Sequence, residues 1–189
     1  LWNYTTGFYV DSAPAVAGDV VYVASEDWNV YAFDAATGAL LWNYTTGNQI
    51  MLSSPVVDNG MVYVGFEDFK VYALNATNGA LVWTYATGDM VVSSPAVANG
   101  VVYIGSDDGK IYALNAFDGG LVWDYATGGP VFSSPAVAGG VVYVGSYDSK
   151  VYALNASTGI LLWNYTTGNP VVSSPAVANG IVYVGSEDF

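Results

Sequence analysis

The sequence predicts an all-β protein built from repeated four-stranded antiparallel sheets. Three observations lead to this prediction. A tryptophan recurs every 40 or 41 residues and a proline recurs with the same period. Short runs rich in Val, Ile, Tyr and Trp fill each repeat. Dipeptides such as Asn-Gly, Asp-Gly and Thr-Gly separate the runs, and these dipeptides favour tight turns.

Four runs of strand composition occur within one repeat, at 93–98, 101–105, 110–114 and 121–125. Asn99-Gly100 joins the first two runs, and both residues of such a turn can take positive φ. The other connections are 107–109 and Asp118-Gly119. Both faces of the second run are apolar, which is typical of strands buried on both sides. A repeated four-stranded unit of this size is the blade of a β-propeller.

The whole chain, 1–189, is expected to form a single propeller-repeat domain. The blade units are placed at 8–47, 48–88, 89–128 and 129–168, with a partial unit at 169–189 and an outer strand at 1–7. One extra residue between Trp42 and Pro55 indicates a connection of variable length. The chain thus holds about 4.7 repeats, which fits an incomplete five-bladed ring or part of a ring of seven or eight blades. The second alternative is favoured, because the termini fall at no natural blade boundary.

The composition excludes several classes of function. The chain has 189 residues, 16 acids against 3 Lys, no Arg, no His and no Cys, and its net charge is −13. Three Lys cannot supply the charge that binds nucleic acid or an anionic membrane. Imidazole, thiolate and disulfide chemistry are also absent. No run approaches the length of a membrane-spanning helix, and no export signal is visible after Leu1-Trp2.

The segment 32–42, Ala-Phe-Asp-Ala-Ala-Thr-Gly-Ala-Leu-Leu-Trp, resembles the repeat of PQQ-like (quinoprotein-type) β-propellers. The same frame returns at 73–83, 113–123 and 153–163, although Asn78 and Asp118 replace the Thr. The resemblance implies a structural girdle in which each Trp docks between adjacent blades and donates its indole N–H. Its members are Trp2, Trp42, Trp83, Trp123 and Trp163.

The same resemblance does not extend to catalysis. Quinoprotein dehydrogenases hold their quinone with a cation, an Arg, a catalytic Asp and, in many, adjacent Cys. This chain lacks Arg and Cys, and its blades are nearly interchangeable. We therefore expect no catalytic residue, no cofactor-binding residue and no enzymatic activity. Similar non-catalytic proteins include the propeller lipoproteins of outer-membrane assembly and archaeal surface proteins.

Nine of the sixteen acids lie in the predicted turn between the second and third strands of the repeats. Carboxylates in such turns suit Ca²⁺, so these turns contain five weak metal candidates. The candidates are Asp27, Asp68, Asp108, Asp148 and Asp188. The alternative, that Asp serves the turn itself, is favoured because no segment matches a calcium-binding loop. Neither a metal nor another cofactor is therefore expected, with calcium as the exception to test.

Two further patterns repeat with the blades. Asn-x-Ser/Thr sequons, which are candidates for glycosylation, begin at Asn3, Asn43, Asn75, Asn155 and Asn164. Pairs of Ser precede the first strand of each blade, as at Ser93-Ser94, and are expected beside the central channel. Packing of small polar residues is favoured over a ring of ligand-binding hydroxyls.

Together these features predict a non-catalytic propeller scaffold, extracellular or at the cell surface, that contacts a protein partner or associates with itself. One alternative is a module that binds a ligand or calcium. A second alternative is a fragment of a quinoprotein (PQQ-dependent) dehydrogenase.

Overall fold

The computed structural model describes residues 1–47 and 53–188, and every regular element in this part of the chain is a β-strand. The described residues contain no helix able to cross a membrane. The extra residue expected between Trp42 and Pro55 falls in a stretch that includes 48–52, which lies outside the described residues, as does the first part of the unit predicted at 48–88.

Four sheets have four antiparallel strands each, in chain order, and a fifth has two. The first comprises β1 (Ala15–Ala17), β2 (Val20–Ser25), β3 (Asn29–Asp34) and β4 (Leu40–Thr45). The second comprises β5 (Val56–Asp58), β6 (Met61–Gly65), β7 (Lys70–Asn75) and β8 (Leu81–Ala86). The third comprises β9 (Ala96–Ala98), β10 (Val101–Gly105), β11 (Lys110–Asn115) and β12 (Leu121–Ala126). The fourth comprises β13 (Ala136–Ala138), β14 (Val141–Ser146), β15 (Lys150–Asn155) and β16 (Leu161–Thr166), and the fifth comprises β17 (Ala176–Ala178) and β18 (Ile181–Tyr183).

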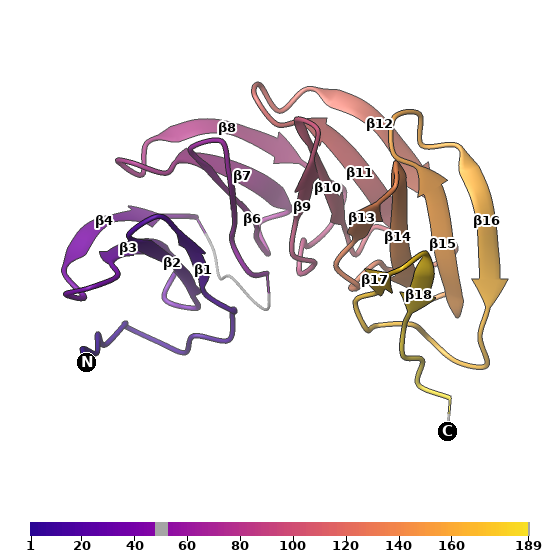
Figure 1. Ribbon diagram of the computed structural model, residues 1–189, viewed down its shortest axis with the longest axis horizontal. Helices are drawn as coiled ribbons and strands as arrows, with labels where there is room; N and C mark the ends of the chain where they lie inside the picture. Colours follow the sequence, from indigo (N-terminus) through magenta and orange to yellow (C-terminus); the bar gives the residue numbers. More distant parts are fainter. Residues whose placement is uncertain (48–52, 189) are drawn as a thin grey trace.

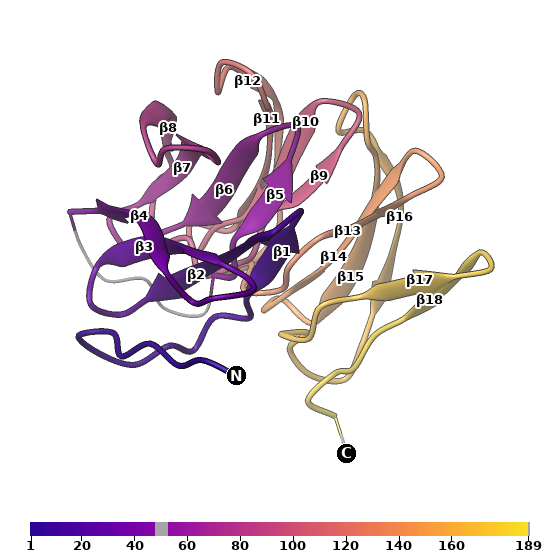
Figure 2. The ribbon, with the colours of Figure 1, turned by 60° about the vertical axis from the view of Figure 1, so that its left-hand side comes forward.

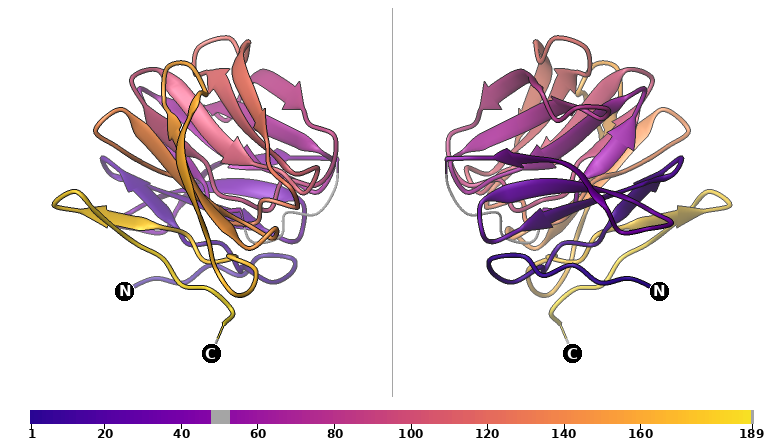
Figure 3. Two further views of the ribbon diagram at one scale, coloured as in Figure 1. Left: turned by 90° about the vertical axis from the view of Figure 1, so that its right-hand side faces the viewer. Right: turned by 90° about the vertical axis from the view of Figure 1, so that its left-hand side faces the viewer.

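The sheets stand side by side in an open arc, as Figure 1 shows. This arrangement confirms the predicted all-β fold of propeller blades. The short first strands β1, β5, β9, β13 and β17 contact one another in sequence along the inner side of the arc (Figure 2). The β17–β18 hairpin stands alone beyond the fourth sheet, and both chain ends lie on one side of the molecule (Figure 3).

The core lies between adjacent sheets. In β7 the four central residues are buried, so this strand packs on both faces, as the apolar runs predict. In β8 only Trp83 is buried. Trp83 joins Tyr63 and Val71 of the second sheet to Ile104 and Leu114 of the third. Each sheet therefore depends on its neighbour for burial, as expected of a repeat array.

A β-bulge recurs at the same place in each four-stranded sheet. In the second sheet Leu74 pairs with Leu81 and Ala73 pairs with Trp83, so Val82 is the extra residue. The bulge leaves Val82 exposed and turns the Trp83 side chain toward the third sheet.

Local turn chemistry agrees with the sequence. Asn99 and Gly100 have φ of 52° and 75°, and the equivalent turns Asn59-Gly60 and Asn179-Gly180 also have positive φ at both residues.

Three strand boundaries differ from the sequence-based expectation. The strand expected at 93–98 begins only at Ala96, because Ser94 bonds sideways to the neighbouring sheets. The strand expected to run to Gly185 ends at Tyr183. The outer strand expected at 1–7 is not formed, since no third strand pairs with this segment among the described residues. Trp2 nevertheless occupies the outer-strand position, where its Nε1 donates to the Ala35 oxygen.

Candidate functional site

The turns between the second and third strands lie along one rim, and we call them the rim turns: 26–28, 67–69, 107–109, 147–149 and, at the chain end, 187–188. The second residue of each rim turn is one of the five Asp considered above as calcium ligands. In four cases the Oδ2 atom of this Asp accepts a hydrogen bond from the backbone N–H of a glycine. Each glycine comes just after the outermost strand, or the outer segment 1–6, of the preceding blade. The donors are Gly7, Gly88, Gly128 and Gly168, at 2.6, 2.8, 2.9 and 3.1 Å.

In each of the four complete sheets, the tyrosine four residues after the rim-turn Asp donates its hydroxyl to that Asp. Tyr112, for example, donates to Asp108 at 2.5 Å. Desolvation opposes ionisation of Asp27, but hydrogen bonds from Tyr31, Gly7 and Asn29 outweigh it and hold the pKa of Asp27 below its usual value. Burial and the adjacent carboxylate raise the pKa of the Tyr31 hydroxyl. Asp27, Asp108 and Asp148 therefore each link the outer segment of one blade to the third strand of the next.

The described residues contain no group of three or more acids arranged to hold a metal ion. Lys70 pairs with Asp68 at 3.0 Å, Lys150 lies 3.8 Å from Asp148, and Lys110 pairs with Asp124 at 2.7 Å. Two of these three pairs involve rim-turn Asp residues, so Asp68 and Asp148 already have a cationic partner within the chain. This environment is that of a structural turn more than of a calcium site.

Four of the five rim turns, all but the one at Tyr147, also begin with an acid, and this second row of acids has no ion pair among the described residues. Desolvation, followed by the charges of Asp89, Asp108 and Glu67, raises the pKa of Asp107 to about 6. Desolvation also raises the pKa of Glu26, with contributions from a hydrogen bond and the charge of Asp11 and from the charge of Glu67. Mutual repulsion along this row marks a strip of uncompensated negative potential.

Four tryptophans connect neighbouring blades by the same contact. The Nε1 atoms of Trp2, Trp42, Trp83 and Trp123 donate to the carbonyl oxygens of Ala35, Ala76, Ala116 and Ala156, at 2.9 to 3.0 Å. Trp163 is 42% exposed and donates no such bond within the described residues. Trp42, Trp83 and Trp123 are buried in these contacts and hold neighbouring blades together.

The serine pairs also connect blades. Ser93 is fully buried, its Oγ donates to the Ser133 oxygen at 3.1 Å, and it accepts from the Gly105 N–H at 3.2 Å. The Ser94 Oγ accepts from the Ser54 N–H at 2.8 Å. These hydroxyls do not form a free ring around a channel.

The sequons fall into two structural classes. Asn3, Asn43 and Asn164 are exposed. Asn75 and Asn155 are half-buried, and their Oδ1 atoms accept backbone N–H groups of the following turns.

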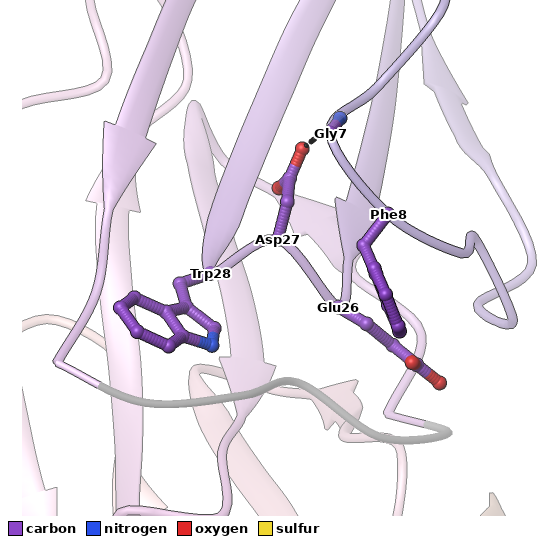
Figure 4. A pocket seen from close by; sticks show the side chains of 5 residues that line it. All are labelled: Gly7, Phe8, Glu26, Asp27 and Trp28. Carbon is purple, nitrogen blue, oxygen red and sulfur yellow. Dashed lines mark hydrogen bonds between the residues drawn. The ribbon is translucent and has the colours of Figure 1, made fainter.

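One hollow lies on the rim beside the Gly7–Asp27 hydrogen bond. It has a volume of about 360 Å³ and is lined by Gly7, Phe8, Glu26, Asp27 and Trp28. Phe8 and Trp28 are 53% and 49% exposed. Figure 4 shows them on opposite sides of Asp27, with the Glu26 side chain alongside Phe8.

Sequence reasoning did not single out Phe8 or Trp28. The signal that could have found them is departure from the repeat, since the third residue of the rim turn is Trp28, Phe69, Gly109 and Ser149 in successive sheets.

Comparison with known proteins agrees with this architecture. Residues 1–130 and 68–188 match the model of the family described as outer membrane protein assembly factor BamB. The chain belongs to this PQQ-like propeller family. A search of curated proteins finds no match.

Solved structures of propellers superpose on most of the chain. BamB from Moraxella catarrhalis is 20% identical, with a TM-score of 0.69 over 97% of this chain and 82% of that one. The computationally designed protein Ika8 is 16% identical, with a TM-score of 0.83 over 92% and 54%. Quinohemoprotein alcohol dehydrogenase from Comamonas testosteroni is 20% identical, with a TM-score of 0.79 over 94% and 39%. The chain thus spans about half the length of the designed protein and less of the dehydrogenase, and these likenesses show the fold.

The quinone of such dehydrogenases is an anion that needs cationic ligands. The only side-chain cations of this chain are its three Lys, and each is engaged in an ion pair on the rim or the outer strands. This chain therefore offers such a cofactor no unpaired lysine.

Proposed function

We propose that this chain is a non-catalytic propeller scaffold that binds a partner protein outside the cytoplasm. The observation that carries the proposal is that the repeated polar side chains are engaged in hydrogen bonds of the fold itself. The repeated Asp, Ser, Tyr and Trp side chains, which would be the reactive or ligand-binding groups of a propeller enzyme, bond between blades, as Tyr63 does by donating its hydroxyl to the Ala116 oxygen.

The location rests on the family. The matched family is described as an outer-membrane assembly factor, which favours a compartment outside the cytoplasm. Exposed sequons at Asn43 and Asn164 support an extracellular or surface location in an organism that glycosylates exported proteins. The partner is a protein, since the net charge of −13 disfavours nucleic acid and anionic lipid.

A photo-crosslinking amino acid at exposed positions tests the scaffold function. We would place it at Phe69 on a rim turn and at Val82 on an outer strand, and compare both with the buried Val102. Expression in the source organism should give a discrete adduct with one protein from at least one exposed position and none from Val102. No adduct from any exposed position would contradict the proposal.

Enzymatic activity is tested separately with the purified chain. Addition of pyrroloquinoline quinone, Ca²⁺, an alcohol or sugar and a dye acceptor should give no turnover above a heat-denatured control. Turnover that co-purifies with the chain would favour the dehydrogenase alternative. A Ca²⁺-dependent rise in melting temperature would favour the calcium-binding alternative.

A further inference from the structure

The first sheet departs from the repeat at one place on the rim. In the next three sheets the residue directly after the rim turn is a lysine, but in the first sheet it is Asn29. The third position is Trp28, and the connection before the sheet reads Gly7-Phe8-Tyr9 where a later copy reads 88–90, Gly-Asp-Met. The structure brings Phe8 and Trp28 together around the hollow described above. The first sheet thus has an aromatic pair, Phe8 and Trp28, and no lysine, whereas the second sheet has Phe69 together with Lys70.

Trp28 and Phe8 are each about half exposed although both are large and apolar. Phe8 contacts the ring of Tyr9, with ring centroids 4.8 Å apart, on one side. Trp28 also has a φ of 73°, a conformation that the equivalent Gly109 adopts without strain. A glycine would therefore suit the turn better than Trp28, so the tryptophan is not there for the stability of the turn.

The hollow is negatively charged and holds no lysine. Asp27 lies between the two rings, and its hydrogen bonds to Gly7, Tyr31 and Asn29 keep it ionised without a counter-ion. Glu26 adds a second carboxyl group, and the charges of Asp11 and Glu67 act on it. Lys70, Lys110 and Lys150 are paired in the other sheets. The first sheet lacks the cation that its neighbours carry.

We propose that this hollow binds a lysine or arginine side chain of the partner protein. The rings of Phe8 and Trp28 provide cation–π faces, and Asp27 and Glu26 provide the counter-charge. An organic cation suits this lining better than a metal ion, because aromatic walls offer Ca²⁺ no oxygen ligands. The inference rests on the proposed scaffold function, for which it specifies a contact.

Titration with short peptides tests the hollow by itself. The probes are blocked pentapeptides with a central Lys or Arg between glycines, and a matched peptide with acetylated lysine. Binding is followed by the ¹⁵N–¹H signals of the Trp28 indole and the Gly7 and Phe8 amides. The Lys and Arg peptides should shift these signals saturably, and the acetylated peptide should not. Equal shifts with the acetylated peptide would overturn the proposal.

Three variants sharpen the test. Trp28→Gly relaxes the backbone and removes one aromatic face, so it should weaken binding about fivefold or more. Asn29→Lys restores the lysine of the other sheets, which should compete with the peptide and abolish its binding. Phe69→Gly changes the equivalent residue of the second sheet, where Lys70 is present, and should leave binding unchanged. Equal losses in Trp28→Gly and Phe69→Gly would overturn the assignment, provided that both variants keep the native amide spectrum.

Other occupants give different results. Ca²⁺ that shifts the same signals and displaces the peptide would replace the proposal with a metal site. Shifts spread along Glu67 and Asp107 instead of the hollow would mean general attraction to the acidic rim, and would also overturn it. If peptides fail to bind while crosslinked adducts still form, the hollow is wrong and the scaffold stands. If peptides bind but no adduct forms, the scaffold fails and the chemistry of the hollow stands.

Discussion

The ring of Trp83 covers Gly119 of the next sheet so closely that a Cβ atom on Gly119 would lie 2.7 Å from the tryptophan Cδ2. Gly38, Gly79 and Gly159 have the same relation to Trp2, Trp42 and Trp123. The glycine of the repeat motif is therefore needed for two reasons, a positive φ and the approach of the ring.

Gly119→Ala separates these two reasons when it is compared with Gly100→Ala. Both glycines have a φ near 75°, but nothing lies within 4 Å of a Cβ on Gly100. Gly100→Ala should cost only the strain of the left-handed conformation, about 1 kcal/mol, whereas Gly119→Ala should cost about 2–4 kcal/mol because the ring must move. Urea unfolding of both variants measures the difference. Equal losses would show that ring packing is not what selects Gly119.

Trp83→Phe should destabilise the chain far more than Trp163→Phe. Trp83 is 7% exposed and donates a 3.0 Å hydrogen bond to the Ala116 oxygen, whereas Trp163 is 42% exposed at the open end of the arc. Loss of the bond and of buried area should cost about 2–3 kcal/mol at position 83, against about 0.5 kcal/mol or less at position 163. Thermal unfolding at equal protein concentration checks this. A large loss at Trp163 would mean that its ring is covered in solution, as by self-association.

Local sequence signals predict the strands and turns well, because they depend on neighbouring residues. Asn99-Gly100 has the expected turn conformation, and the Val and Tyr runs form the buried strands. The partners of the rim Asp residues were not predictable in the same way. Asp108 meets Gly88, which is 20 residues away, only after two blades pack together. The repeated Asp-to-Tyr spacing of four residues was a visible signal for the Asp108–Tyr112 bond. Trp28 was visible only as a departure from the repeat.

The two classes of sequon should differ in glycan occupancy when the chain passes through a glycosylating secretory pathway. Asn43 and Asn164 are exposed on outer strands. By contrast, the backbone after Asn75 is covered, since the Ala76 oxygen accepts bonds from Trp42 and Tyr22. Intact mass spectrometry should show sugar-sized increments that decrease in number in Asn43→Gln and Asn164→Gln, with those on the exposed Asn3 retained, while Asn75→Gln leaves the mass profile unchanged apart from the substitution. Increments that depend on Asn75 would show that blade packing does not limit occupancy.

The free energy of unfolding should depend on pH through Asp107. Desolvation and the charges of Asp89, Asp108 and Glu67 raise its pKa to about 6 in the folded chain, above its ordinary value of 3.8. The folded state then binds more protons than the unfolded state between these two values, so ionisation of Asp107 lowers stability as the pH rises through this window.

Asp107→Asn should therefore stabilise the chain at pH 7, by about 1 kcal/mol once solvent screening is allowed for, and should give no gain at pH 4. Glu187→Gln is the matched control, because Glu187 occupies the same rim-turn position but is exposed in the last sheet. Its stability should equal that of the parent chain at both pH values. A gain for Asp107→Asn that is the same at pH 4 and pH 7 would mean that packing of the amide, and not relief of charge repulsion, is the cause.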